Sequence, residues 1–231
     1  MFPFEPKIQI ASGHQVHHSR ILSEIGPVLT AERQKKIRQV VEGRCFSQAI
    51  VLESIYDRGN ASAVVRSAEA LGFVNIHMIE SGEKFKESAR VTAGADKWVE
   101  ITKWKSSREC VAALKSEGKQ IIVTHLSPKS RPIREIDFGK PSALVLGNEK
   151  DGVSQDMIEM ADHCVILPMV GFVQSYNISV AGALSCYHIF LERTRKLGAN
   201  ADVNEEQKSI LQALYTLRTQ DSAVDILLRP N

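Results

Sequence analysis

Short apolar runs and stretches with helical periodicity alternate along most of the chain. The apolar runs are predicted as strands, at residues 48–53, 75–79, 98–104, 120–125, 143–146 and 165–167. The last two runs lack the polar alternation of a half-exposed strand, which is typical of strands covered on both faces of a parallel sheet.

Helices are predicted between these strands, with Thr30, Asn60 and Ser106 placed as N-caps. They cover residues 30–43, 61–71, 106–118, 178–197 and 205–218. Strands and helices in turn predict an α/β fold with a largely parallel sheet. The predicted domain boundaries are 1–45 for a basic helical extension, 46–197 for the α/β domain and 198–231 for a second helical extension.

Two of the predicted strands break into Gly, Pro, Asn and Ser residues where they end. Gly147 begins the first of these loops and Pro168 begins the second. In open α/β sheets, ligands lie at the carboxyl ends of the strands, because the loops there vary while the strands fix their position. We therefore expect the two loops to lie side by side and to form one ligand pocket.

The predicted helix 61–71 places its apolar residues on one face and Arg66 on the other. The helical neighbours of Arg66 are small residues, among them Ser62 and Ala63, whereas a solvated face usually carries Lys, Glu and Gln. From the residues alone, Arg66 is either an exposed arginine or a contact for an anion.

Composition fits one main domain with appendages, since the 231 residues are 43% hydrophobic and 24% charged. The net charge of +2 hides a basic stretch in the first predicted helix. Its cations are Arg33, Lys35, Lys36 and Arg38. Such a helix fits phosphate binding and an ordinary solvated face about equally well.

The four cysteines are far apart and form no CxxC pair, which favours free thiols in a reducing compartment. No apolar run approaches membrane-spanning length, so we expect no membrane partner. The N-terminus lacks the pattern of a signal peptide. We expect a cytoplasmic protein and leave an organelle open.

His14, His17 and His18 lie in a segment without a matching carboxylate or cysteine cluster. A flexible or surface tail is expected there, and no metal site is predicted in the chain. No GxGxxG follows the first predicted strand, which argues against a dehydrogenase and against the commoner methyltransferase fold.

Three groups of residues follow one another in a characteristic order. They are Asn60 with Arg66, then Leu146-Gly-Asn-Glu149 with Gly152, then Leu167-Pro-Met-Val-Gly171 with Ser175-Tyr-Asn-Ile-Ser-Val-Ala181. Together they resemble the motifs of the SpoU/TrmH family of RNA 2′-O-ribose methyltransferases in the SPOUT superfamily. The likeness runs from Thr30 to about Gly198, and the segments around the motifs resemble the TrmH branch.

The chain departs from the family pattern in three places. Arg58-Gly59 stands where the family usually has Pro followed by His or Gln, Tyr176 stands where it usually has Leu, and residues 1–28 are extra. The first two differences concern details of ligand and substrate binding and leave the reaction class unchanged.

The resemblance implies a SPOUT-type domain with a C-terminal trefoil knot near residues 143–190, working as a homodimer and binding S-adenosylmethionine in a bent form. The implied cofactor contacts are Thr124, Leu126, Gly147, Leu167, Met169 and Tyr176. Glycines such as Gly147 and Gly171 give room for close backbone approach. Without the motifs, the apolar residues among these contacts are better explained by core packing.

The resemblance also implies the catalytic residues, which are Arg66, Asn60, Glu149, Ser175 and Asn177. Arg66 would reach across the dimer into the partner's cofactor site. A guanidinium does not normally give up its proton, so we expect a clamp on the phosphate and the forming alkoxide rather than a base. From the residues alone, Asn60 and Asn177 are also candidates for helix caps, and Glu149 for a solvated loop carboxylate.

The implied substrate is a guanosine ribose in the D-loop of tRNA, and a ribosomal RNA target and a non-catalytic RNA-binding relative remain as alternatives. The cations of the first helix and those past the long helix, Arg193, Arg195 and Lys196, are expected to bind phosphates. The long helix is small and apolar around residues 178–184, so it has to be buried on more than one side, either in a dimer or within its own domain.

Overall fold

The computed structural model describes residues 1–80 and 94–229. The chain forms two compact units, one made of Met1–Arg44 together with Ala201–Asn231 and the other of Cys45–Asn200. The two ends of the chain therefore fold together in one unit, whereas the sequence had suggested two separate extensions.

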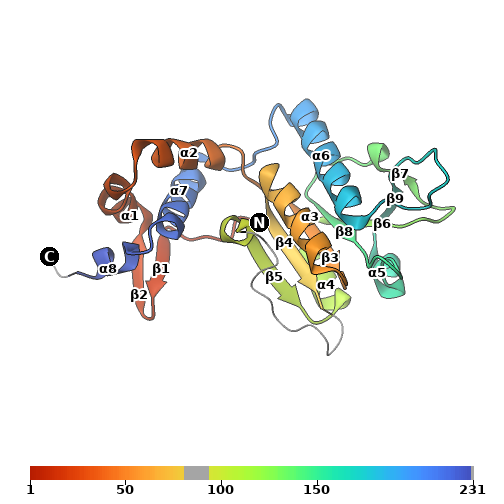
Figure 1. Cartoon of the computed structure of the whole chain (residues 1–231), viewed down its shortest axis with the longest axis horizontal. Coiled ribbons are helices and arrows are strands. Elements are labelled where there is room, and N and C mark those ends of the chain that lie inside the picture. The colour runs from red at the N-terminus through yellow and green to blue at the C-terminus, as the bar shows by residue number, and fades with distance from the viewer. Residues whose placement is uncertain (81–93, 230–231) are drawn as a thin grey trace. The chain divides into compact units, whose positions relative to one another are not determined.

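A seven-stranded sheet forms the centre of the larger unit (Figure 1). Its strands, in spatial order, are β5 (Glu100–Trp104), β4 (Phe73–Ile79), β3 (Cys45–Glu53), β8 (Ser142–Leu146), β6 (Gln120–Thr124), β9 (His163–Ile166) and β7 (Arg131–Pro132). Every neighbouring pair is parallel. The prediction of an α/β fold with a largely parallel sheet is confirmed.

Helices cover both faces of this sheet. Helices α3 (Arg58–Ala70) and α6 (Ile178–Leu197) pack on one face, and α4 (Ser107–Ser116) and α5 (Gln155–Met160) pack on the other. Within β8, Leu144 and Leu146 join the first core while Ala143 and Val145 join the second. This double burial explains why the strand is apolar throughout.

The short helices η2 (Ala95–Trp98) and η3 (Ile133–Glu135) complete the larger unit. Gly182 lets α6 approach α3 closely, because a Cβ at Gly182 would lie 2.8 Å from Cγ2 of Val64 and 3.1 Å from Cδ1 of Leu146. One face of α6 is therefore fixed against its own domain.

The smaller unit holds a β-hairpin and helices. Its elements are β1 (Lys7–Ala11), β2 (His14–His17), α1 (His18–Glu24), η1 (Gly26–Val28), α2 (Ala31–Val41), α7 (Glu205–Thr219) and α8 (Ala223–Leu228). Ile8 and Val16 of the hairpin pack with Ile21 and Ile210 in a shared core. His14 and His17 are exposed, as predicted for a surface segment, but the segment is not a tail, because it forms a hairpin whose apolar residues Ile8 and Val16 are buried in this core.

No helix among residues 1–80 and 94–229 is long and apolar enough to cross a membrane.

Candidate functional site at the carboxyl edge of the sheet

The loops that follow the parallel strands meet at the carboxyl edge of the sheet. The loop after β8 spans residues 147–154, and the loop after β9 spans residues 167–177. Strand β6 lies between β8 and β9, so the strands that carry the two loops are not direct neighbours in the sheet. Thr124, the last residue of β6, lies between them and donates its hydroxyl to the carbonyl of Val145 at 3.0 Å.

The loop after β8 folds back on itself at Gly147. A Cβ there would lie 2.3 Å from the carbonyl carbon of Gly152 and 2.3 Å from the nitrogen of Val153, so only glycine fits. Asn148 and Gly152 exchange backbone hydrogen bonds of 2.8 and 2.9 Å. The expected close backbone approach at Gly147 is thus present, and its partner is the chain's own loop.

Asn148 holds this turn in place, a role that the sequence interpretation missed. Its Oδ1 accepts from the amides of Lys150 at 2.8 Å and Asp151 at 3.2 Å, while its Nδ2 donates to the carbonyl of Ser54 at 2.7 Å. The signal was present as an Asn placed to form an Asx turn, in which the side chain bonds the backbone two residues on.

Glu149 and Asn60, predicted as catalytic residues from separate motifs, contact each other directly. Asn60 Nδ2 donates to Glu149 Oε1 at 3.0 Å, and the amides of Tyr56 and Asp57 donate to the same carboxylate at 3.0 and 3.3 Å. Burial alone raises the pKa of Glu149, but these hydrogen bonds outweigh it and hold the pKa below its usual value. The site therefore keeps Glu149 ionised.

The prediction that Asn60 caps α3 is wrong. The helix begins earlier, at Arg58, and its N-cap is Asp57, whose side chain accepts from the amide of Asn60 at 3.0 Å. Asn60 lies inside the first turn instead, so its side chain is available for Glu149.

Arg66 lies nearly two turns after Asn60 on the same helix, and its side chain is exposed. It forms no hydrogen bond or ion pair within residues 1–80 and 94–229. An exposed arginine on a helix whose first turn is anchored to Glu149 is available to an anionic ligand.

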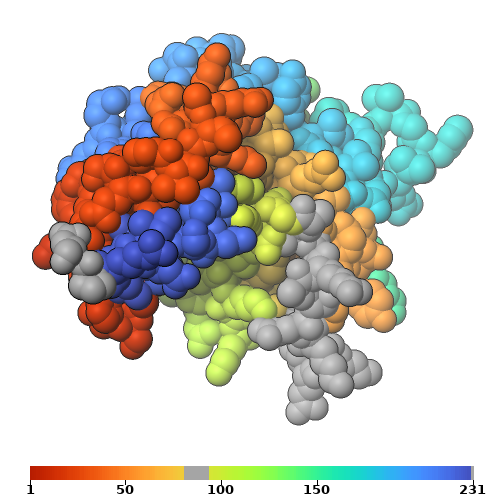
Figure 2. Space-filling view, turned by 60° about the vertical axis from the view of Figure 1, so that its left-hand side comes forward, coloured from red at the N-terminus to blue at the C-terminus, as the bar shows by residue number. Residues whose placement is uncertain are grey.

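The loop after β9 stands out from the unit (cyan in Figure 2). Val170 and Phe172 are fully exposed, and residues 169–175 form no backbone hydrogen bond with the described parts of the chain. Tyr176 donates its hydroxyl to the carbonyl of Pro168 at 3.0 Å. A Cβ at Gly171 would meet nothing within 4 Å, so no part of the described chain approaches this glycine closely and the space beside it is open.

The remaining predicted cofactor residues lie around this loop. Leu167 and Met169 are half-buried, and Leu167 also packs against the core, whereas Leu126 is exposed. Ser175 is exposed. Asn177 is the N-cap of α6 and accepts from the amide of Ser179 at 2.9 Å, which confirms its capping role.

Most of the cations predicted to contact RNA are exposed, but one of them is buried. Arg33, Lys35, Lys36 and Arg38 are all exposed on α2. Arg193, by contrast, is 2% exposed and donates to the carbonyls of Phe138 and Asn200, so the prediction that it binds RNA is wrong. Its guanidinium instead joins α6 to two connecting segments of the same unit.

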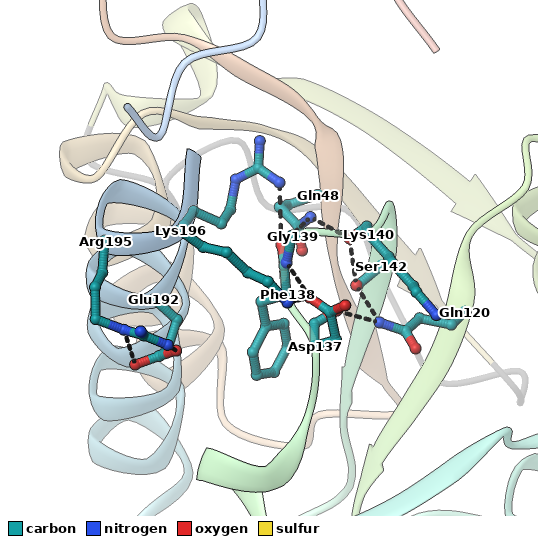
Figure 3. A network of polar contacts seen from close by, with 11 residues as sticks. Gln48, Gln120, Asp137, Phe138, Gly139, Lys140, Ser142, Glu192, Arg195 and Lys196 are labelled. Carbon is teal, nitrogen blue, oxygen red and sulfur yellow. Dashed lines mark hydrogen bonds and ion pairs between the residues drawn. The ribbon is translucent and has the colours of Figure 1, made fainter. Parts of the chain in front are cut away.

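Arg195 and Lys196 are exposed but paired within the unit. Figure 3 shows Arg195 beside Glu192, at 2.7 Å, and Lys196 beside Asp137, at 2.6 Å. Exposed pairs of this kind are weak, so both cations remain accessible to a phosphate that competes with the carboxylates.

Among residues 1–80 and 94–229, no group of three or more His, Cys, Asp and Glu side chains is placed to hold a metal ion. The four cysteines are free thiols.

A family model matches the part of the chain that carries this site. The model of the SpoU rRNA Methylase family covers residues 47–187, which includes the strands, both loops and the start of α6. The chain belongs to this family. It is therefore an RNA methyltransferase, and its cofactor is S-adenosylmethionine.

Relatives that match most of the chain carry a more specific name. The tRNA (guanosine(18)-2′-O)-methyltransferase of Borreliella burgdorferi is 36% identical over 198 residues, which are 84% of this chain and 90% of that protein. The protein of the same name from Escherichia coli K12 is 35% identical over 161 residues, 70% of each chain.

Solved structures show the same fold. The crystal structure of an Aquifex aeolicus TrmH/SpoU tRNA modifying enzyme has a TM-score of 0.70 and 34% identity, covering 80% of this chain and 95% of that one. The SpoU methyltransferase AviRb from Streptomyces viridochromogenes, solved with AdoMet, has a TM-score of 0.55 and 25% identity, covering 64% and 60%.

Proposed function

We propose that this protein methylates the ribose 2′-hydroxyl of a guanosine in the D-loop of tRNA, at the position given in the names of its relatives, in the cytoplasm. The observation that carries the proposal is the contact between Asn60 and Glu149, which joins two family motifs in a chain about one-third identical to enzymes named for this reaction.

The residues of the two loops suit the cofactor chemically. The loop after β9 offers free backbone donors and acceptors beside exposed apolar side chains, which matches an adenine edge and its face. Thr124, Leu126, Gly147, Leu167, Met169 and Tyr176 would hold the cofactor. When bound, S-adenosylmethionine supplies an electrophilic methyl group.

Arg66 would act on the ribose and its phosphate. Its fork of donors suits a phosphate beside the target nucleotide and the negative charge that forms on the 2′-oxygen. Asn60, fixed by Glu149, would orient the arginine or the ribose, and Ser175 and Asn177 would order the cofactor loop. These roles need no deprotonated arginine.

The proposal includes a homodimer and a trefoil knot near residues 143–190. Support for the dimer comes from α6, which keeps a second apolar face exposed after its first face has packed on α3. The exposed residues are Val180, Leu184, Tyr187 and Leu191. An apolar stripe of this kind on an α-helix is typical of a covered surface. Sedimentation of the protein at micromolar concentration tests this, and a monomer there would contradict it.

The exposed cations of α2 would bind tRNA phosphates. Binding of this kind weakens steeply with salt and carries little sequence preference, so the site itself must choose the nucleotide.

The test is transfer of labelled methyl groups from S-adenosylmethionine to unmodified tRNA and ribosomal RNA, with the product ribose mapped. The wild type should label a D-loop guanosine. Arg66→Ala should lose activity on the order of 10²–10³-fold, as for other donors that stabilise an oxyanion, while its affinity for the cofactor stays unchanged. Label found only in ribosomal RNA would overturn the tRNA proposal, and full activity of Arg66→Ala would overturn the assigned role.

A further inference from the structure

A buried carboxylate outside the family motifs lies at the end of β3. Glu53 is 3% exposed and accepts from both the amide and the hydroxyl of Ser154, at 2.8 and 2.7 Å. Ser107 of α4 also donates its hydroxyl to Glu53. Burying a carboxylate is costly unless hydrogen bonds replace water, and the donors of Ser154 and Ser107 supply these hydrogen bonds.

Ser154 is where the loop after β8 ends. It is the N-cap of α5, and its hydroxyl accepts from the amide of Met157 at 3.2 Å while donating to Glu53. The start of the same loop is bound to the residue that follows β3, since Asn148 donates to the carbonyl of Ser54. The end of β3 therefore holds the Gly147 loop at both of its ends.

The loop in turn holds the segment that follows β3. Glu149, from the middle of the loop, accepts from the amides of Tyr56 and Asp57 and from Asn60. Two carboxylates thus join the same two segments. Glu53, at the end of β3, binds Ser154 of the loop after β8, and Glu149 of that loop binds the backbone between β3 and α3. A shift of Ser154 would move both the cofactor loop and the anchor of Asn60.

We infer that Glu53 is a positioning residue for S-adenosylmethionine, because it fixes the loop that carries Gly147 and Glu149. The inference rests on the proposed function only for the identity of the RNA. Cofactor binding needs no RNA, so the two can fail separately.

The chemistry of the contact predicts a graded series of variants. In Glu53→Gln, the amide oxygen can still accept from the Ser154 amide, and both serine hydroxyls can rotate to accept from the new NH₂ group. In Glu53→Leu, the Ser154 amide has no acceptor, and a backbone N–H cannot rotate away. Glu53→Gln should therefore be mild and Glu53→Leu severe.

The experiment is calorimetric titration of each variant with S-adenosylmethionine. Glu53→Leu should raise the dissociation constant by about tenfold or more, and Glu53→Gln by less than about threefold, since an unpaired buried donor acts on that scale. The matched control is Ser107→Ala, which removes the donor on α4 and leaves the loop bonded. Its affinity should stay within about twofold of the wild type.

Hydrogen exchange separates positioning from general loss of structure. In Glu53→Leu, the amides of Tyr56 and Asp57 should exchange faster, because Glu149 moves with the loop, while protection in β4 stays unchanged. If Glu53→Leu does not fold, Glu53→Asp replaces it, since its shorter side chain cannot reach both donors of Ser154. An unchanged dissociation constant in the folded variant would overturn the inference, as would equal weakening by Ser107→Ala.

Discussion

The loops after β8 and β9 lie at the same edge of one sheet but are held in opposite ways. The loop after β8 is closed by its own backbone at Asn148 and Gly152 and is bonded to the end of β3. The loop after β9 exposes Val170 and Phe172 and forms no backbone hydrogen bond with described residues over 169–175. The first loop is organised before any ligand binds, whereas the second leaves its polar backbone groups available to one.

The glycines of the two loops give the largest expected difference. Gly147→Ala places a Cβ against the backbone of Gly152 and Val153, so the loop must open, and we expect the rate of methyl transfer to fall about 100-fold, as for other misplacements of about 1 Å. Gly171→Ala is the matched control and should change this rate less than about twofold, because its Cβ meets nothing. Methyl transfer from labelled S-adenosylmethionine measures both, and equal effects would remove the contrast between the loops.

The next largest difference is expected between two amide side chains, that of Asn148 in the loop after β8 and that of Gln174 in the loop after β9. Asn148→Ala loses the bond to Ser54 and the turn bonds to Lys150 and Asp151, which we expect to lower the free energy of unfolding by about 1–2 kcal/mol and cofactor affinity by about tenfold. The control is Gln174→Ala in the exposed loop, where no contact is lost. Chemical denaturation and cofactor titration measure the pair. A stable Asn148→Ala protein with normal affinity would show that the turn forms without its side chain.

Lowering the pH should weaken cofactor binding through the loop after β8 only, and this effect should be smaller than those of the substitutions at Gly147 and Asn148. Hydrogen bonds hold the pKa of Glu149 below its usual value, so its contribution is present above the usual pKa of a glutamate and is lost as pH falls through the lowered pKa. Asn60→Ala removes one of these bonds, and the loss should then begin at a higher pH. The effect is the smallest of the three because Glu149 is exposed and water replaces part of the lost contacts.

Cofactor titrations across the acid range, with wild type and Asn60→Ala side by side, measure this shift. The same pH profile for both proteins would mean that Asn60 does not stabilise the ionised form of Glu149. The loop after β9 offers no carboxylate over residues 168–176, so its own shape should not change with pH in this range.

Local pattern was a good guide to the elements and to the chemistry. The helix from Ile178 to Leu197 has the predicted bounds, and Thr30 and Ser106 cap their helices as expected. Two of the motifs meet at the carboxyl edge, where Asn60 of the first contacts Glu149 of the second. One exception is the hairpin of β1 and β2, where a tail was expected. Another is the start of α3, where Asp57 rather than Asn60 is the cap, a choice between two suitable residues that spacing alone does not make.

The sequence by itself determined the α/β class, because strands buried on both faces must be apolar throughout and helices must carry a periodic apolar face. Only the tertiary structure decided that β6 lies between β8 and β9, that Glu149 meets Asn60 across 89 residues of chain, that Arg193 is buried and that both chain ends share one core. Periodicity reports which side of an element is covered. It carries no record of which distant segment covers it, since that choice is made by packing and hydrogen bonding among segments far apart in the chain.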